Sequence, residues 1–220
     1  ILLATKPDNL RNTAPASKTS TWSIAKRESK KLYTVGTASA ILALLRTIRQ
    51  VGLPVWALAI HMDAAQAALY IGLASALDFA LFYTSGQVMD RFGRRFAAVP
   101  TMVLLSLTIC LAPLAGTPNL FLWIAIAMSL ANGLGSGIIM VLGADLAPKD
   151  ARSEFLAAYR LLSDIGQAAA PIAFGWIVAL AGLASAFVFM GSLGFVGAWL
   201  MYRYIPRFKV VAPEQLINRN

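Results

Sequence analysis

The chain has 220 residues, of which 58% are hydrophobic and only 13% are charged, yet its formal net charge is +9. An ordinary soluble domain has about 25% charged residues, so this composition excludes a typical soluble globular domain. The cations are unevenly placed, which a bulk nucleic-acid binder would not need, and nucleic acid is not expected as a partner. The single cysteine, Cys110, excludes an internal disulfide bond.

The N-terminal 34 residues divide into two parts. Ile1–Thr5 has the composition of the end of a preceding transmembrane helix, because a signal peptide would begin with basic residues. Residues 6–34 are polar and basic and contain Pro7 and Pro15, so we expect a cytoplasmic linker. Its end near Trp22 to Leu32 is expected to form a short amphipathic helix on the membrane surface. We therefore interpret the chain as a fragment.

Six apolar stretches follow this linker, each with the length of about 20 residues that a membrane-spanning helix needs. We expect the spans at Val35–Ile60, Ala67–Val88, Phe96–Ala115, Leu120–Gly143, Phe155–Ala181 and Ser185–Tyr204. A soluble bundle would show a polar face on each helix, and stretches such as Phe121–Leu130 lack one. The sequence therefore predicts an all-α membrane protein, with a six-helix bundle over residues 35–205 and a cytoplasmic tail over 206–220.

Lysine and arginine in the termini and loops occur before the first span and after the second, fourth and sixth. The alternate loops carry none. The residues are Lys6, Arg11, Lys18, Lys26, Arg27, Lys30, Lys31, Arg91, Arg94, Arg95, Lys149, Arg152, Arg203, Arg207, Lys209 and Arg219. Short loops rich in Lys and Arg stay on the cytoplasmic side. We therefore expect both termini to be cytoplasmic, in the plasma (inner) membrane, with anionic lipid accounting for the basic patches.

The loop between the second and third spans reads GQVMDRFGRR. This stretch resembles the G-x-x-x-D-R-x-G-R-R motif of the major facilitator superfamily, which stands after the second helix of a six-helix half in that family. The motif positions here are Gly86, Asp90, Arg91, Gly93, Arg94 and Arg95. The resemblance covers about residues 33 to 208.

Family members usually have two six-helix halves joined by a cytoplasmic linker. The resemblance therefore implies half of a twelve-helix fold with a 3+3 inverted repeat, and the apolar stub favours the C-terminal half. A missing N-terminal half and the lipid bilayer are the expected partners. The resemblance also implies a conformational gating role for the motif: Asp90 would interact with a neighbouring helix N-terminus, and the arginines would tie the helix ends.

Arg46 and Arg49 are the first candidates for a substrate site. They are three residues apart and share a helix face, and a charge at the centre of a span costs about 2.5–3.5 kcal/mol on insertion scales. The resemblance implies that this helix lines the central cavity, where Arg46, Arg49 and the following Gln50 would bind an anionic or polar group. Alternatively, the helix begins near Ile41 and both arginines reach the cytoplasm or an acid of the missing half.

Three further polar sites lie within the spans. Asp78 is a candidate proton-coupling residue, because burial disfavours the charged carboxylate; the alternative is a structural pair with an arginine of the missing half or with the nearby loop. Asn132 is a candidate hydrogen-bond donor to substrate. Its segment, Asn132–Gly137, contains three glycines that favour close helix packing or a bend around a substrate. Arg160 and Asp164 are expected to satisfy each other.

These observations predict secondary active transport of a small solute by alternating access. By resemblance, the first hypothesis is a proton-coupled exporter of small organic molecules. A uniporter or symporter of an anionic or polar metabolite and a non-transporting six-helix scaffold remain alternatives. A membrane enzyme is not expected, because it would need a cluster of catalytic side chains and the single histidine, His61, lies in a loop. No cofactor, metal ion or catalytic residue is expected.

Overall fold

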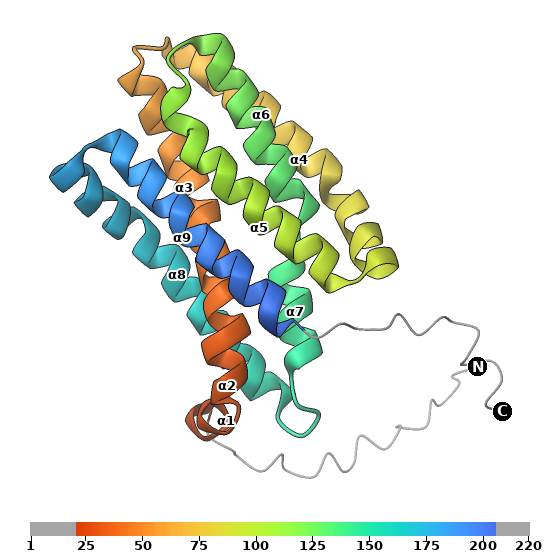
Figure 1. Cartoon of the computed structure of the whole chain (residues 1–220). Helices are drawn as coiled ribbons and strands as arrows, with labels where there is room; N and C mark the ends of the chain where they lie inside the picture. The colour runs from red at the N-terminus through yellow and green to blue at the C-terminus, as the bar shows by residue number, and fades with distance from the viewer. Residues whose placement is uncertain (1–20, 206–220) are drawn as a thin grey trace, which may run out of the picture.

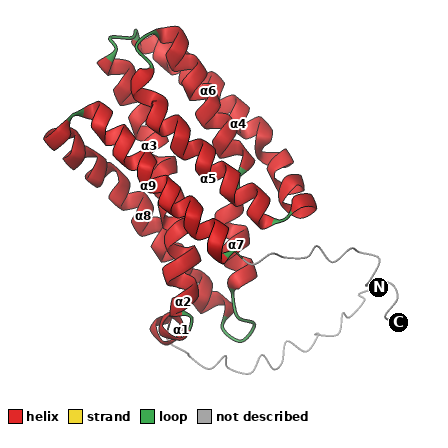
Figure 2. Ribbon diagram, in the orientation of Figure 1, coloured by secondary structure: helices red, strands yellow, loops and turns green. Residues whose placement is uncertain are grey.

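A computed structural model describes residues 21–205, and its regular elements in this range are helical (Figures 1 and 2). The expected apolar stub, residues 6–20 of the linker and the expected tail lie outside the described residues. The elements are α1 (Thr21–Arg27), α2 (Ser29–Lys31), η1 (Leu32–Gly36), α3 (Thr37–Ala59), α4 (Ala64–Phe92), α5 (Arg94–Leu111), η2 (Ala112–Leu114), α6 (Pro118–Leu134), α7 (Ile138–Leu146), α8 (Arg152–Ala181) and α9 (Leu183–Tyr204).

Six candidate membrane spans occur in the described part of the chain, as the hydropathy predicts. The first is longer than expected, because α2, η1 and α3 continue one another from Ser29 to Ala59 over 31 residues. The alternative in which this helix begins near Ile41 is therefore wrong. Leu32 and Val35 explain the extension, since both are buried against the bundle and hold the N-terminal turns in place.

Local sequence signals set several helix ends. The carboxylate of Asp63 accepts hydrogen bonds from the backbone N–H groups of Ala65 and Gln66 and so caps the N-terminus of α4. Thr117 caps α6, with Pro118 at the first helical position. A single glycine with positive φ, Gly182, joins α8 to α9, as the short break between the fifth and sixth spans predicts.

The fourth span differs from the expected continuous helix over Leu120–Gly143. Helix α6 ends at Leu134, three residues form a turn, and α7 begins at Ile138. Gly137 has a φ of +78°, a left-handed conformation that glycine adopts without steric cost. The glycines at 133, 135 and 137 lower the helix propensity here, and the chain uses them to break the span rather than to bend it smoothly.

Helix α3 occupies the centre of the bundle, between α8 and α9 on one side and α4 and α6 on the other (Figure 1). Helices α5 and α9 pack along one another, as do α4 and α6. One end of the bundle carries the α3–α4, α5–α6 and α8–α9 connections. The opposite end carries the α4–α5 connection, α7, the α7–α8 loop and the short helices α1 and α2 (Figure 1).

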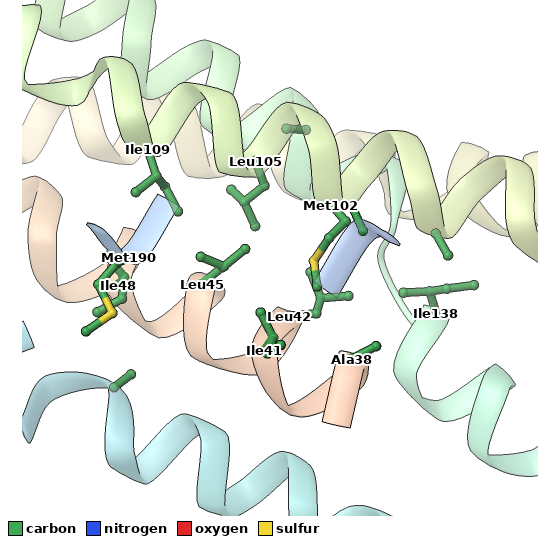
Figure 3. Close-up of a cluster of buried hydrophobic side chains, with 14 of the residues drawn as sticks. Ala38, Ile41, Leu42, Leu45, Ile48, Met102, Leu105, Ile109, Ile138 and Met190 are labelled. Atoms are coloured by element: carbon green, nitrogen blue, oxygen red, sulfur yellow. The ribbon is translucent and has the colours of Figure 1, made fainter. Parts of the chain in front are cut away.

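The apolar core lies where α3, α5 and α9 meet (Figure 3). Leu42, Leu45 and Ile48 of α3 are fully buried. Leu42 and Leu45 face Met102 and Leu105 of α5, and Ile48 lies beside Met190 of α9 (Figure 3). The helices approach closely because their contact faces carry small residues, as is common in membranes. At Gly166 of α8, an added Cβ would collide with the backbone carbonyl of Ala40 in α3.

The α1–α2 segment is docked onto the end of the bundle. Ile24 is buried against α8. Arg27 makes a bidentate pair with Asp150 of the α7–α8 loop, with Nη–Oδ distances of 2.7 and 3.1 Å. Lys31 donates from Nζ to the carbonyl oxygen of Leu146 at 3.1 Å. Two short helices occupy the segment near Trp22 to Leu32 where one amphipathic helix is expected, and Ile24 is the buried residue of α1.

Acidification is expected to loosen this docking. The hydrogen bond from Arg27 lowers the pKa of the Asp150 carboxyl below its ordinary value. Such a group contributes to stability above its unfolded pKa of about 4 and loses that contribution as the pH falls through its folded pKa. Amide protection factors in residues 21–31 should therefore fall when the pH drops below about 4. In the Asp150→Asn variant, residues 21–31 should show this reduced amide protection already at neutral pH. Equal protection of the variant and the wild-type protein at neutral pH would contradict a stabilising Arg27–Asp150 pair.

Candidate functional site

A polar cluster joins three of the candidate spans. Arg49 of α3 donates from Nη2 to Oδ2 of Asp78 in α4, and from Nη1 to Oγ of Ser129 in α6, both at 2.7 Å. The side chains of Arg49 and Asp78 are only 10% and 17% exposed. A charge taken out of water is stable only when it is paired and hydrogen-bonded, and both conditions hold here. The ion-pair partner of Asp78 is therefore Arg49 of this chain and not an arginine of a missing half.

Asn132 completes the environment of the carboxylate. Its Nδ2 lies 3.0 Å from Oδ1 and 2.8 Å from Oδ2 of Asp78. Its Oδ1 is buried and has no partner among the described residues. Ser129 and Asn132 are three residues apart, so α6 presents both on one face. Asp78 is therefore held from two sides, by a cation of α3 and an amide of α6.

The backbone carbonyl groups at the break between α6 and α7 accept hydrogen bonds from the side chains of Arg46 and Ser85. Arg46 donates from Nη2 to the carbonyl oxygen of Gly135 at 2.8 Å. The Ser85 hydroxyl lies 3.0 Å from the carbonyl oxygens of both Leu134 and Ser136. No water is present in a bilayer core to satisfy such carbonyls, so side chains must do so. Arg46 also places its charge at the C-terminus of α6, where the helix dipole favours a cation.

The cluster carries an excess of one positive charge, from two arginines and one carboxylate (2 − 1 = +1). The Nε–H group of Arg46 is buried and has no hydrogen-bond partner among the described residues. Within residues 21–205, no group of three or more His, Cys, Asp or Glu side chains is placed to bind a metal ion. The side chains of Arg46, Arg49, Asp78 and Asn132 supply hydrogen bonding and charge pairing at this site.

Two sequence expectations fall outside this cluster. Gln50, the third residue of the expected substrate site, is exposed on α3 and is not part of the hydrogen-bond network. The expectation that Arg160 and Asp164 satisfy each other is wrong, because both are exposed and no ion pair joins them. Their order along the helix explains the difference, since an acid placed N-terminal to the base is the favourable arrangement for an i,i+4 pair.

The motif loop forms a second polar site at the end of the bundle that carries α7. Gly93, with a φ of +92°, separates α4 from α5 by a single residue. The first residue of α5, Arg94, donates from Nη1 to Asp90 at 2.8 Å and from Nε to Asp145 of α7 at 3.1 Å. Arg94 thus links the α4–α5 corner to the C-terminal end of α7.

Of the other motif residues, Asp90 and Arg91 are exposed, and Gly86 and Arg95 are half-buried. The guanidinium of Arg95 lies 3.7 Å from the ring centroid of Tyr202 in α9, a cation–π distance. Arg91 is exposed beside Phe92, and an added Cβ on Gly86 would meet nothing within 4 Å. The carboxylate side chain of Asp90 is 76% exposed and its ion-pair partner is Arg94. The motif therefore connects α4, α5, α7 and α9 through two arginines.

Sequence reasoning missed two serines that belong to the site. Ser129 stands three residues before Asn132, and Ser85 stands seven residues after Asp78, so helical spacing alone places each on the face of a predicted site residue. That spacing was a usable signal. The acceptor carbonyl of Gly135 could not be predicted, because it becomes available only where the helix breaks.

Six apolar helices, an ion pair between candidate spans and a basic loop motif define the class of a polytopic membrane protein. The profile of the Major Facilitator Superfamily matches residues 35–218, and the chain belongs to this family. Its six candidate membrane-spanning helices agree with an integral membrane protein of this family.

The chain is similar to the multi-drug resistance efflux pump PmrA from two strains of Streptococcus pneumoniae, TIGR4 and R6. The identity is 31% over 175 residues in both cases, which covers 75% of this chain. The same alignment covers 42% of each relative, so the chain spans less than half the length of these proteins.

Proposed function

We propose that this chain is the C-terminal half of a secondary active transporter that exports small organic molecules in exchange for protons, by alternating access. The observation that carries the proposal is the buried cluster in which Arg49, Asp78 and Asn132 join three spans. Ionisable residues inside membranes are costly and mark substrate or ion pathways. Similarity to an efflux pump supports export as the direction.

Asp78 is the proposed proton-coupling residue. Its carboxylate accepts hydrogen bonds from Arg49 and Asn132, and its partial exposure leaves a path for a proton. Protonation would remove the charge that attracts Arg49 and convert one acceptor oxygen into a donor. The link between α3 and α4 would then weaken. A contact with two such states is what a transporter needs in order to change its conformation with proton binding.

Arg46, Arg49 and Asn132 are the proposed substrate-binding residues, with Gln50 at the exposed side of α3. The single excess positive charge of the cluster favours a substrate that carries an anionic or strongly polar group. The same charge supports a second candidate function, a uniporter or symporter of an anionic or polar metabolite. The two candidates differ in one property. Only in the exporter does an inward flow of protons drive the substrate outward.

The partner is proposed to be a second, N-terminal six-helix half, related to this chain as halves of the family are. The relatives are more than twice as long as the aligned region, and α8 offers a surface for such a partner. Its exposed residues Arg160, Asp164 and Gln167 follow one another at i, i+4 and i+7, inside a candidate span. Lipid cannot solvate these groups cheaply, which supports contact with protein or with an aqueous cavity.

The motif is proposed to act as a gate at the cytoplasmic side. Arg94 holds Asp145 of α7, and Arg95 stacks on Tyr202 of α9. Breaking these contacts would free α7 and α9 from the α4–α5 corner. The gathering of loop cations at the same end supports a cytoplasmic location for this end, and so for both termini, in the plasma (inner) membrane.

Proton-coupled export is tested with inverted membrane vesicles that contain the intact gene product. Ethidium and fluorescein serve as cationic and anionic probes, and an acidic vesicle interior should drive uptake of at least one of them. Asp78→Asn should abolish the response to the pH gradient, because the amide cannot exchange a proton. Undiminished proton dependence in this variant would contradict the assignment of Asp78.

The matched control is Asp63→Asn, the same chemical change at the N-cap that precedes the same helix. Asn caps a helix N-terminus about as well as Asp, so α4 should stay intact. Gradient-driven uptake should be normal in this variant. Gradient-independent flux of fluorescein in the wild-type protein would favour the uniporter, and absence of flux for every probe would favour a non-transporting scaffold.

A further inference from the structure

Four exposed side chains lie on consecutive helices at the N-terminal edge of the bundle, and no contact in the described structure explains their exposure. Trp22 and Tyr33 are 81% and 79% exposed, although both are large aromatic residues. Lys26 and Lys30 are exposed as well. Trp22 and Lys26 are one turn apart on α1, and Lys30 and Tyr33 are three residues apart on the next helix. We call these four residues the aromatic–lysine face.

The cations of this segment divide into two kinds. Arg27 pairs with Asp150 and with Glu28, and Lys31 pairs with Glu28 at 2.9 Å. Among the described residues, no carboxylate lies within 4.0 Å of Lys26 or Lys30. The two cations without a carboxylate are the ones that accompany the two exposed aromatic rings. Two of the four cations of this segment, Arg27 and Lys31, therefore make docking contacts, whereas Lys26 and Lys30 face outward with the rings.

The docking contacts fix which way this face points. Ile24 and Leu32 are buried against the bundle, and the Arg27–Asp150 and Lys31–Leu146 contacts lie on the docked side. The segment cannot turn its rings inward without breaking both polar contacts and exposing the two apolar side chains. The aromatic–lysine face is therefore a fixed feature of the surface.

Helix length places Lys30 and Tyr33, the half of this face on the continuous helix, at the depth of the lipid headgroups. The continuous helix from Lys30 to Ala59 rises by about 1.5 Å per residue, which gives a length of about 44 Å. The bilayer is about 30 Å thick across its hydrocarbon core and about 40–45 Å with its headgroups. If Ala59 ends at the far membrane surface, Tyr33 and Lys30 lie in the near headgroup layer. Tyr and Trp rings prefer that layer.

We propose that the aromatic–lysine face binds anionic lipid headgroups of the leaflet on the motif side of the membrane. The ammonium groups of Lys26 and Lys30 pair with lipid phosphates, and the rings of Trp22 and Tyr33 insert between headgroup and acyl chain. Bound lipid then presses the α1–α2 segment onto α8 and the α7–α8 loop. This inference does not rest on the proposed transport function, because it concerns only the docked segment and the bilayer.

The test uses the chain in lipid nanodiscs, made of phosphatidylcholine alone or of phosphatidylcholine with phosphatidylglycerol. Hydrogen exchange of residues 21–33 is the readout. Exchange in the wild-type chain should slow several-fold when phosphatidylglycerol is present, and high salt should reduce the difference because it screens charges. Lys26→Gln/Lys30→Gln should exchange at one rate in both lipids. Lys26→Arg/Lys30→Arg, which keeps both charges, should behave as wild type.

The matched control is Lys149→Gln/Arg152→Gln, which removes the same charge from exposed positions at the same end of the bundle. It should keep the lipid-dependent slowing. Equal exchange of the wild-type chain in both lipids, or slowing that survives in Lys26→Gln/Lys30→Gln, would overturn the proposal. Inorganic phosphate added to phosphatidylcholine nanodiscs should not slow exchange; slowing by phosphate alone would assign the face to a soluble anion instead of lipid.

Discussion

Arg49→Gln is expected to destabilise the folded chain more than any other single change in the polar cluster. The substitution leaves the largely buried Asp78 carboxylate paired with no cation, and removing one partner of a fully buried ion pair costs about 3–5 kcal/mol, an upper limit here. It also leaves the buried hydroxyl of Ser129 without its donor. Thermal unfolding in detergent, followed by tryptophan fluorescence, measures the loss.

Two further variants separate the ion pair from a general effect of losing an arginine. Arg49→Gln/Asp78→Asn should recover part of the lost stability, because the double variant buries no unpaired charge. Arg160→Gln removes an arginine from a span where it is exposed and has no ion-pair partner in the described structure, and should change the stability little. Equal melting temperatures for Arg49→Gln and Arg160→Gln would show that the pair does not stabilise the bundle.

Gly166→Ala is expected to separate α3 from α8. The added Cβ would collide with the backbone oxygen of Ala40, and a backbone atom cannot move aside as a flexible side chain can. Overpacking of this kind costs about 1–3 kcal/mol and sometimes more. The same contact positions Tyr159, whose hydroxyl lies 2.5 Å from that of Ser39 in α3, so this hydrogen bond should be lost as well. The yield of monodisperse protein and its melting temperature should both fall.

Gly175→Ala is the matched control for this change. Gly175 lies on the same helix, but an added Cβ there would meet nothing within 4 Å. Alanine also has a higher helix propensity than glycine. The control should therefore melt at the wild-type temperature or slightly above it. A wild-type melting temperature for Gly166→Ala would mean that α3 and α8 do not approach as closely as the structure places them.

These predictions bear on the proposed function, because stability and activity compete at the polar cluster. The contacts of Arg49 and Asp78 hold α3, α4 and α6 together in the conformation described here. If protonation of Asp78 releases α3, the ion pair must be strong enough to define one state and weak enough to open. Arg49→Gln should accordingly lose both melting temperature and proton coupling, whereas Gly166→Ala should lose stability without altering the pH dependence of any remaining transport.

The sequence by itself determined the class of the protein and the number of spans. Hydropathy is a local property of about 20 consecutive residues, so the spans can be read without knowing which helices touch. The motif from Gly86 to Arg95 was equally local and pointed to the family that the profile match shows. The candidate residues Arg46, Arg49, Asp78 and Asn132 were also visible, because charge and amide groups are rare inside apolar stretches.

Only the tertiary structure decided which of these residues meet. Arg49 and Asp78 are 29 residues apart in the chain, and their contact depends on how α3 packs beside α4 and α6. Arg46 donates a hydrogen bond to the carbonyl oxygen of Gly135 at the helix break. In a continuous helix, that oxygen would have accepted a backbone hydrogen bond instead. Arg160 and Asp164 failed to pair although their spacing allowed it. Hydrogen bonds and ion pairs form between neighbours in space, and in a bundle the neighbours are set by helix packing, which composition and periodicity do not encode.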